Sequence, residues 1–123
     1  MIFTEIFTPG LKVNKILENV TVSFSRIDEV NKEGAFKKRV PLMLNAYGMK
    51  VHGDQSLEKG EMVLVDIVCG ENNTVTLIGE VAGVKKQKAG EAYENSIDFI
   101  HMSLSQKYLL NKILTDLKTG RLC

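Results

Sequence analysis

The histidines and cysteines are the residues best suited to metal binding or redox chemistry, and their spacing argues against both. His52 and His101 lie far apart, and neither has a metal-ligand partner at helical or hairpin spacing. Cys69 follows an apolar run and is expected to be a buried thiol, whereas Cys123 is the last residue. Cysteines so placed form neither a disulfide framework nor a zinc site. The sequence therefore predicts no metal site, and free thiols favour a reducing, cytoplasmic location.

No pattern in the sequence is typical of catalysis. The serines lie in no nucleophile-elbow pattern. Neither G-x-x-x-x-G-K-S/T nor G-x-G-x-x-G is present, so the usual phosphate-binding loops are missing. Asp66 and Glu80 could approach each other across strands, but spacing alone does not make them a catalytic pair. We therefore expect a protein that is not an enzyme and that carries no cofactor.

Two basic clusters, Lys37–Arg39 and Lys85–Lys88, are the remaining candidates for a binding surface. The formal net charge is only +1, so no strong overall field selects nucleic acid, an anionic membrane or an acidic partner. A nucleic-acid-binding barrel would need exposed aromatic residues for base stacking, and the sequence has no Trp and only 3 Tyr. Such basic runs are common in solvated turns, and nucleic-acid binding is kept only as an alternative.

Alternation between apolar and polar residues predicts β-strands over most of the chain. Residues 19–26 place Val20, Val22 and Phe24 on one face, which is the period of a half-buried strand. Turn signals separate further extended runs, at residues 39–47, 61–68, 74–84 and 96–100. Gly48 interrupts the first run before it continues over residues 49–51, and Gly79 and Gly83 break the run at 74–84. Strands at this spacing indicate a small antiparallel barrel or sandwich, here spanning residues 18–102.

The period changes to that of a helix after residue 102. Ser103 and Gln106 have the spacing of a capping box, and Gly120 is a suitable stop, so we expect a helix over residues 103–119. Such a helix is too short to be stable alone, and we expect its apolar face to pack on the barrel. That face carries residues at i, i+3, i+4 and i+7: Leu110, Ile113, Leu114 and Leu117.

Residues 1–17 form an N-terminal segment whose apolar residues also have helical spacing, up to Pro9. Two interpretations are open. The segment folds onto the surface of its own domain, or it is an arm for docking or dimerisation. No basic run followed by an apolar run opens the chain, and no 18-residue apolar stretch occurs, so we expect neither a secretory signal nor a membrane helix. The interface candidates are Ile2, Phe3, Ile6 and Phe7.

From Gly48 onward, the order of these elements resembles a PilZ domain. That family has a turn glycine that opens a strand, an L-x-x-G loop before the next strand, a strand with a G-E-V-like step, a strand ending in Phe, and a C-terminal helix. The corresponding segments are Gly48–Val51, Leu57–Gly60, Met62–Val68, Thr76–Val81, Ile97–Phe99 and Leu104–Leu117. The resemblance implies a single domain, a small antiparallel β-barrel of about six strands followed by one helix. It also implies a bacterial role linked to cyclic-di-GMP or surface motility.

In that family, cyclic-di-GMP is bound by R-x-x-x-R before the first barrel strand and by D/N-x-S-x-x-G, whose glycine opens the next strand. Here Lys12 and Lys15 precede the first strand, and lysine lacks the planar fork with which arginine pairs with phosphates. Aligned on Gly48, Met43 takes the Asp/Asn place and Asn45 takes the Ser place. If the nucleotide binds, the resemblance implies contacts from Lys12, Lys15, Asn45 and Gly48.

A second segment, Asp54–Gly60, reads D-x-S-x-x-x-G and is one residue too long for the motif. Placing the motif there leaves one strand too few before the helix, so Asp54 and Ser56 are interpreted as turn residues. We expect a degenerate PilZ-like adaptor that binds a partner protein, with weak or absent nucleotide binding. A true cyclic-di-GMP receptor that uses lysines is the alternative, and self-association is left open.

Overall fold

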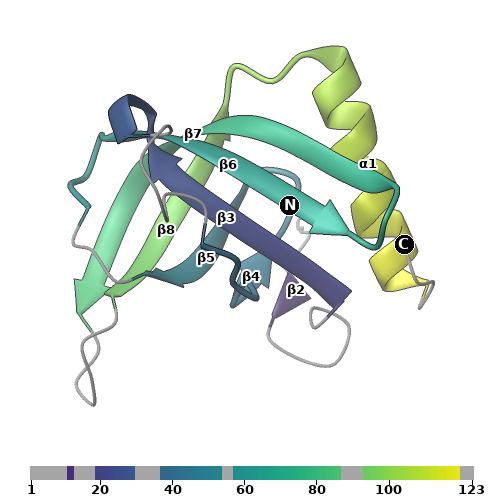
Figure 1. Ribbon diagram of the computed structural model, residues 1–123, viewed down its shortest axis with the longest axis horizontal. Helices are drawn as coiled ribbons and strands as arrows, with labels where there is room; N and C mark the ends of the chain where they lie inside the picture. Colours follow the sequence, from purple (N-terminus) through teal and green to yellow (C-terminus); the bar gives the residue numbers. More distant parts are fainter. Residues whose placement is uncertain (1–10, 13–18, 30–36, 54–56, 87–92, 120–123) are drawn as a thin grey trace.

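The computed structural model is a curled antiparallel β-sheet with one helix packed against it (Figure 1), which confirms the mainly β fold class. The structure describes residues 11–12, 19–29, 37–53, 57–86 and 93–119. Its strands are β2 (Leu11–Lys12), β3 (Val20–Arg26), β4 (Met43–Leu44), β5 (Gly48–Gly53), β6 (Met62–Cys69), β7 (Asn73–Lys86) and β8 (Tyr93–Ile100). A 3-10 turn, η2 (Ile27–Glu29), follows β3, and helix α1 (Leu104–Lys118) follows β8.

The described strands form one sheet in the order β2-β4-β5-β8-β7-β6-β3, and every neighbouring pair is antiparallel. The sheet curls back on itself, because Val22 of β3 and Arg39 exchange two backbone hydrogen bonds of 2.7 Å. The backbone N–H of Leu42 then donates to the carbonyl of Lys50 at 2.7 Å. The segment before β4 therefore links β3 to β5, and β3 to β8 are the six strands of a partly closed barrel.

Two strands differ in extent from the sequence prediction. The run expected over residues 39–47 is in regular strand only at Met43–Leu44, because Pro41 has no N–H to donate to a ladder and residues 45–47 form a turn. Its expected continuation over residues 49–51 is part of β5. In contrast, β7 continues through Gly79, where a break was expected. A Cβ on Gly79 would lie 2.4 Å from Cγ2 of Ile97, so the glycine allows β7 and β8 to pack closely. The irregularity comes later, as a register shift between Val81 and Gly83.

Helix α1 covers the barrel with the face that the sequence predicted, since Leu110, Ile113, Leu114 and Leu117 are all buried. The predicted capping box is present. The backbone N–H of Gln106 donates to Ser103 Oγ at 3.1 Å, and that of Ser103 donates to Gln106 Oε1 at 2.8 Å. Gln106 Nε2 also donates to the carbonyl of Thr76 at 2.8 Å, which ties the start of the helix to β7.

Two residues in the barrel interior depart from ordinary core chemistry. Cys69 is fully buried, as expected, but it is disulfide-bonded rather than a thiol, so it no longer supports a reducing compartment. Cys123 lies outside the described residues. Asn95 of β8 is also fully buried, and neither its Oδ1 nor its Nδ2 makes a hydrogen bond.

A tight turn joins β4 to β5 and lies against the end of β8. Asn45 Oδ1 accepts hydrogen bonds from the backbone N–H groups of Tyr47 at 2.8 Å and Gly48 at 2.9 Å, a local bonding that asparagine favours in turns. The carbonyl of Tyr47 accepts a 2.8 Å bond from the N–H of Phe99. A Cβ on Gly48 would lie only 2.4 Å from the carbonyl oxygen of Ile97, so a glycine is needed for this approach.

Truncating the buried face of α1 should destabilise the domain. We expect Leu114→Ala and Leu117→Ala each to lower the free energy of unfolding by about 2–5 kcal/mol, because each leaves a cavity in the core. Leu104→Ala is the control, since Leu104 is 84% exposed on the same helix. Denaturant unfolding followed by circular dichroism measures the difference. Unchanged midpoints for both core variants would show that α1 is not part of the core.

The close approach at Gly48 gives a second prediction. Gly48→Ala should cost about 1–3 kcal/mol, because the new methyl group meets backbone that must shift. Gly83→Ala is the matched control, since a Cβ at Gly83 meets nothing within 4 Å. Thermal unfolding of the two variants side by side makes the comparison. Equal midpoints would show that the β5–β8 contact tolerates a side chain.

Candidate functional site

The two halves of the nucleotide-binding motif implied by the resemblance come together at one edge of the sheet. Strand β2 pairs with β4, so the backbone of Lys12 lies opposite Met43 and that of Leu11 lies opposite Leu44. The N-terminal lysine and the D/N-x-S-x-x-G segment are therefore neighbours, although 30 positions separate them in the sequence. Lys15 lies outside the described residues.

Asn45 and Gly48 both have a structural role in the β4–β5 turn. The Asn45 side-chain oxygen already accepts two backbone hydrogen bonds, so this acceptor is used within the turn. The backbone N–H of Asn45 also donates to the carbonyl of Gly48 at 3.0 Å. A role for either residue in ligand binding remains a prediction.

A cation that the sequence analysis missed lies next to the motif. Lys50 of β5 is exposed and stands directly opposite Met43 on one side and Ser96 of β8 on the other. Residues directly opposite in antiparallel strands point to the same face of a sheet. The alternation around it, with Met49 and Val51 buried, was the signal that could have placed Lys50 on the outer face.

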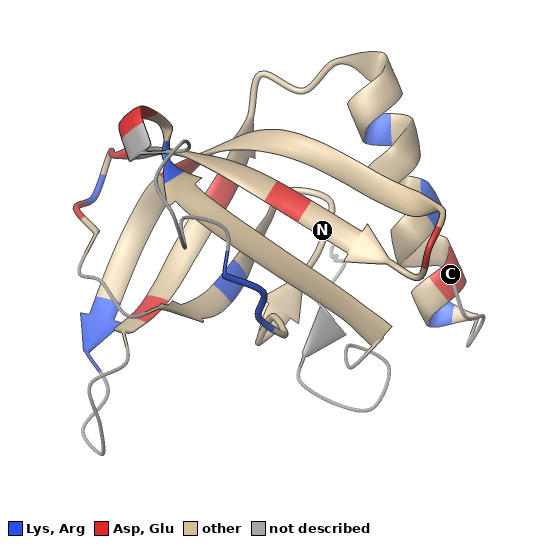
Figure 2. Cartoon of the chain, in the orientation of Figure 1, with Lys and Arg blue, Asp and Glu red and all other residues tan. Residues whose placement is uncertain are grey.

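The other charged residues do not converge on this face. Figure 2 shows Lys and Arg distributed over several strands and over α1. Lys37 and Lys38 are exposed before β4, and Lys85 and Lys86 are exposed at the end of β7. The described parts of the two basic clusters are thus carried by different elements of the fold.

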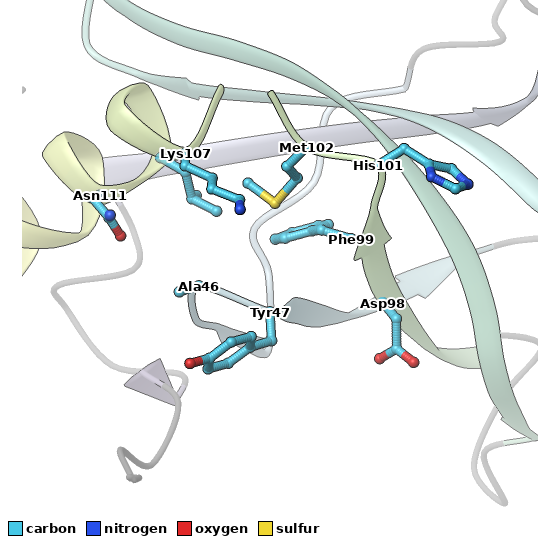
Figure 3. A pocket seen from close by; sticks show the side chains of 9 residues that line it. Ala46, Tyr47, Asp98, Phe99, His101, Met102, Lys107 and Asn111 are labelled. Carbon is cyan, nitrogen blue, oxygen red and sulfur yellow. The ribbon is translucent and has the colours of Figure 1, made fainter. Parts of the chain in front are cut away.

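A pocket of about 850 Å³ opens beside the β4–β5 turn, between the end of β8 and the first turns of α1 (Figure 3). Its lining consists of Ala46, Tyr47, Asp98, Phe99, His101, Met102, Lys107, Leu110 and Asn111. In Figure 3, Phe99 and Met102 extend into the space between the turn and α1, whereas the side chains of His101 and Asp98 point away from Phe99. No sequence pattern predicts a binding role for this region, because its residues come from three separate segments.

His101 lies where the chain leaves β8 for the helix, and its φ of 52° is unusual for a residue other than glycine. His52 is half-buried on β5, opposite Glu94. Within the described ranges, no group of three or more His, Cys, Asp or Glu residues could hold a metal ion. In that same part of the chain, no helix is long and apolar enough to cross a membrane.

The pair of acidic residues considered for catalysis is separated by the strand register. Asp66 lies opposite Thr76, whose Oγ1 donates to Asp66 Oδ1 at 2.5 Å, whereas Glu80 lies opposite Met62. The two carboxylates are therefore four positions apart along the β6–β7 ladder. The interface candidates Ile2, Phe3, Ile6 and Phe7 lie outside the described residues, as do Asp54 and Ser56.

Comparison with known proteins identifies the architecture through structure rather than sequence. No protein-family model matches the sequence, and no curated protein matches it. The PilZ domain of YcgR from Escherichia coli, solved with cyclic-di-GMP, is similar over 93% of this chain and 93% of its own, with a TM-score of 0.64 and 11% identity. MrkH of K. pneumonia in its apo state is similar over 91% of this chain and 50% of its own, with a TM-score of 0.67 and 16% identity.

A further similar structure is the inhibitor of motility MotI/DgrA of Bacillus subtilis. It is similar over 83% of this chain and 48% of its own, with a TM-score of 0.59 and 14% identity. The chain thus spans about half the length of MotI/DgrA and MrkH but nearly all of the isolated YcgR domain. At these identities the likeness shows the fold, and the chain has the fold of a PilZ domain.

Proposed function

We propose that this chain is a degenerate PilZ-like adaptor. It acts by binding a partner protein in a bacterial pathway linked to cyclic-di-GMP or surface motility, performs no catalysis, and binds the nucleotide weakly or not at all. The fold supports the link, because YcgR was solved with cyclic-di-GMP and MotI/DgrA is an inhibitor of motility.

The proposal of weak nucleotide binding rests on the side chains that occupy the positions of the family's binding motifs. Met43 stands where the family has an acidic or amide side chain, and a thioether is a poor hydrogen-bonding group. Asn45 takes the Ser place, but its oxygen is engaged by the N–H groups of Tyr47 and Gly48. The K-x-x-K segment supplies charge without the guanidinium plane that would stack on guanine.

One observation favours the alternative of a true receptor that uses lysines. The backbone of Lys12 lies opposite Met43, and the exposed Lys50 lies on the other side of Met43. Cationic residues therefore flank the motif from two strands. A receptor of this kind would bind the phosphates of cyclic-di-GMP mainly through charge, and its affinity would fall steeply with salt concentration.

Titration calorimetry of the purified chain with cyclic-di-GMP separates the two proposals. We expect no binding or a dissociation constant weaker than about 1 μM, which corresponds to a binding free energy near −8 kcal/mol. A dissociation constant below this value would contradict the proposal that the chain binds cyclic-di-GMP weakly or not at all. In that case Lys12→Ala, Lys15→Ala and Lys50→Ala should each weaken binding, while Lys118→Ala at the exposed end of α1 should not.

A deletion of residues 1–9 tests the two interpretations of the N-terminal segment. If the segment folds onto its own domain, removing its apolar residues exposes the apolar surface that they cover, and we expect the thermal midpoint to fall. These residues are Ile2, Phe3, Ile6 and Phe7. Differential scanning calorimetry and size-exclusion chromatography measure stability and association together. A deletion variant that stays equally stable but no longer self-associates would instead identify the segment as an interface.

A further inference from the structure

The pocket between the β4–β5 turn and α1 has an apolar floor and a polar rim. Phe99 and Leu110 are almost fully buried, at 9% and 1% exposure, and Met102 and Ala46 are half-buried and pack against the core. Tyr47 frames the opening and is 74% exposed. A volume of about 850 Å³ lies within the range of pockets that bind small molecules, so a large side chain also fits.

The side of the rim formed by α1 favours negative charge. Lys107 and Asn111 lie one turn apart on α1 and both line the pocket. Residues 104–115 contain two lysines, Lys107 and Lys112, and no acidic residue. The amino-terminal end of a helix also carries a partial positive charge. Asp98 is the one acidic side chain among the lining residues, and in Figure 3 it points away from Phe99.

An exposed apolar surface continues from the pocket along α1. Leu104 is 84% exposed and Tyr108 is 68% exposed, and they are four residues apart, so they are neighbours on the helix surface. The pocket-lining residues Lys107 and Asn111 lie three positions after Leu104 and Tyr108, so each adjoins one of these two side chains on the helix surface. Exposed apolar surface of this kind marks protein interaction sites and ligand-binding grooves. A peptide is the occupant that would use both the pocket and the adjoining helix surface.

We propose that this surface is the docking site of the adaptor, and that its occupant is a peptide segment of a partner protein. A large aliphatic or aromatic side chain of the peptide enters the pocket above Phe99, and a neighbouring Asp or Glu pairs with Lys107. The rest of the peptide lies on Leu104 and Tyr108. This inference rests on the proposed adaptor function, since it names the surface through which that function acts.

The proposal is tested without knowing the partner, by selecting peptides from a random phage-displayed library on the immobilised full chain. We expect the selected peptides to share a large apolar residue next to an acidic one. A fluorescein-labelled peptide from the selection is then titrated with variants, and fluorescence anisotropy gives each dissociation constant. Lys107→Glu reverses the charge on the rim, and Asn111→Trp obstructs the pocket from an exposed helix position.

We expect both pocket variants to raise the dissociation constant of the peptide by at least about tenfold, which is the size of effect that central interface residues have. Lys85→Glu is the matched charge reversal at the exposed end of β7 and should leave the constant unchanged. Circular dichroism melts of all three proteins establish that they are folded. Because Lys107 and Asn111 are both exposed, neither change removes a core side chain.

Failure to enrich any peptide, or peptides whose binding is indifferent to both pocket variants, would overturn the docking site. Loss of binding with Lys85→Glu but not with Lys107→Glu would place the contact near the end of β7. That result would contradict the proposed docking site but not the proposed adaptor function. Tight cyclic-di-GMP binding in the calorimetric experiment would count against the proposed function independently of the peptide result.

Discussion

The contact between β5 and β8 at Gly48 is the constraint on which the rest of this structure depends. With no side chain there, β5 lies against the carbonyl of Ile97, and the next residue back, Tyr47, accepts a hydrogen bond from Phe99. One glycine thus fixes the β4–β5 turn against the end of β8. That single arrangement sets the edge where β2 meets Met43 and one wall of the pocket next to α1.

Most of the fold could be predicted because its signals are local. The alternation around Val20 and Val22 and the stripe around Leu114 need only the period of one element, and the structure buries these residues as expected. The short β4 was missed because Pro41 and Asn45 override the apolar pattern between them. The closure of the sheet through Arg39 was missed as well, since pairing with Val22 joins residues that no local pattern relates.

The site was harder to predict because it is built from strand pairing. Aligning the motif on Gly48 assigned Met43 and Asn45 to motif positions, but the extended pattern of residues 39–47 gave no sign of the turn at Asn45, of the bonds that its side chain accepts, or of Lys50 beside Met43. The pocket residues belong to three segments that meet only in the folded chain. Their types, two aromatics and a lysine among them, are unremarkable when taken in sequence order.

The buried amide of Asn95 keeps the stability of this barrel below the maximum that its fold allows. An amide that makes no hydrogen bond in an apolar interior costs about 1–3 kcal/mol, and leucine has the same branching without the polar atoms. Natural proteins commonly stop short of their maximum stability. Position 95 is therefore the first position to change in a more stable variant of this domain. Gly53 lies beside it, since a Cβ on Gly53 would lie 2.8 Å from the Asn95 amide nitrogen.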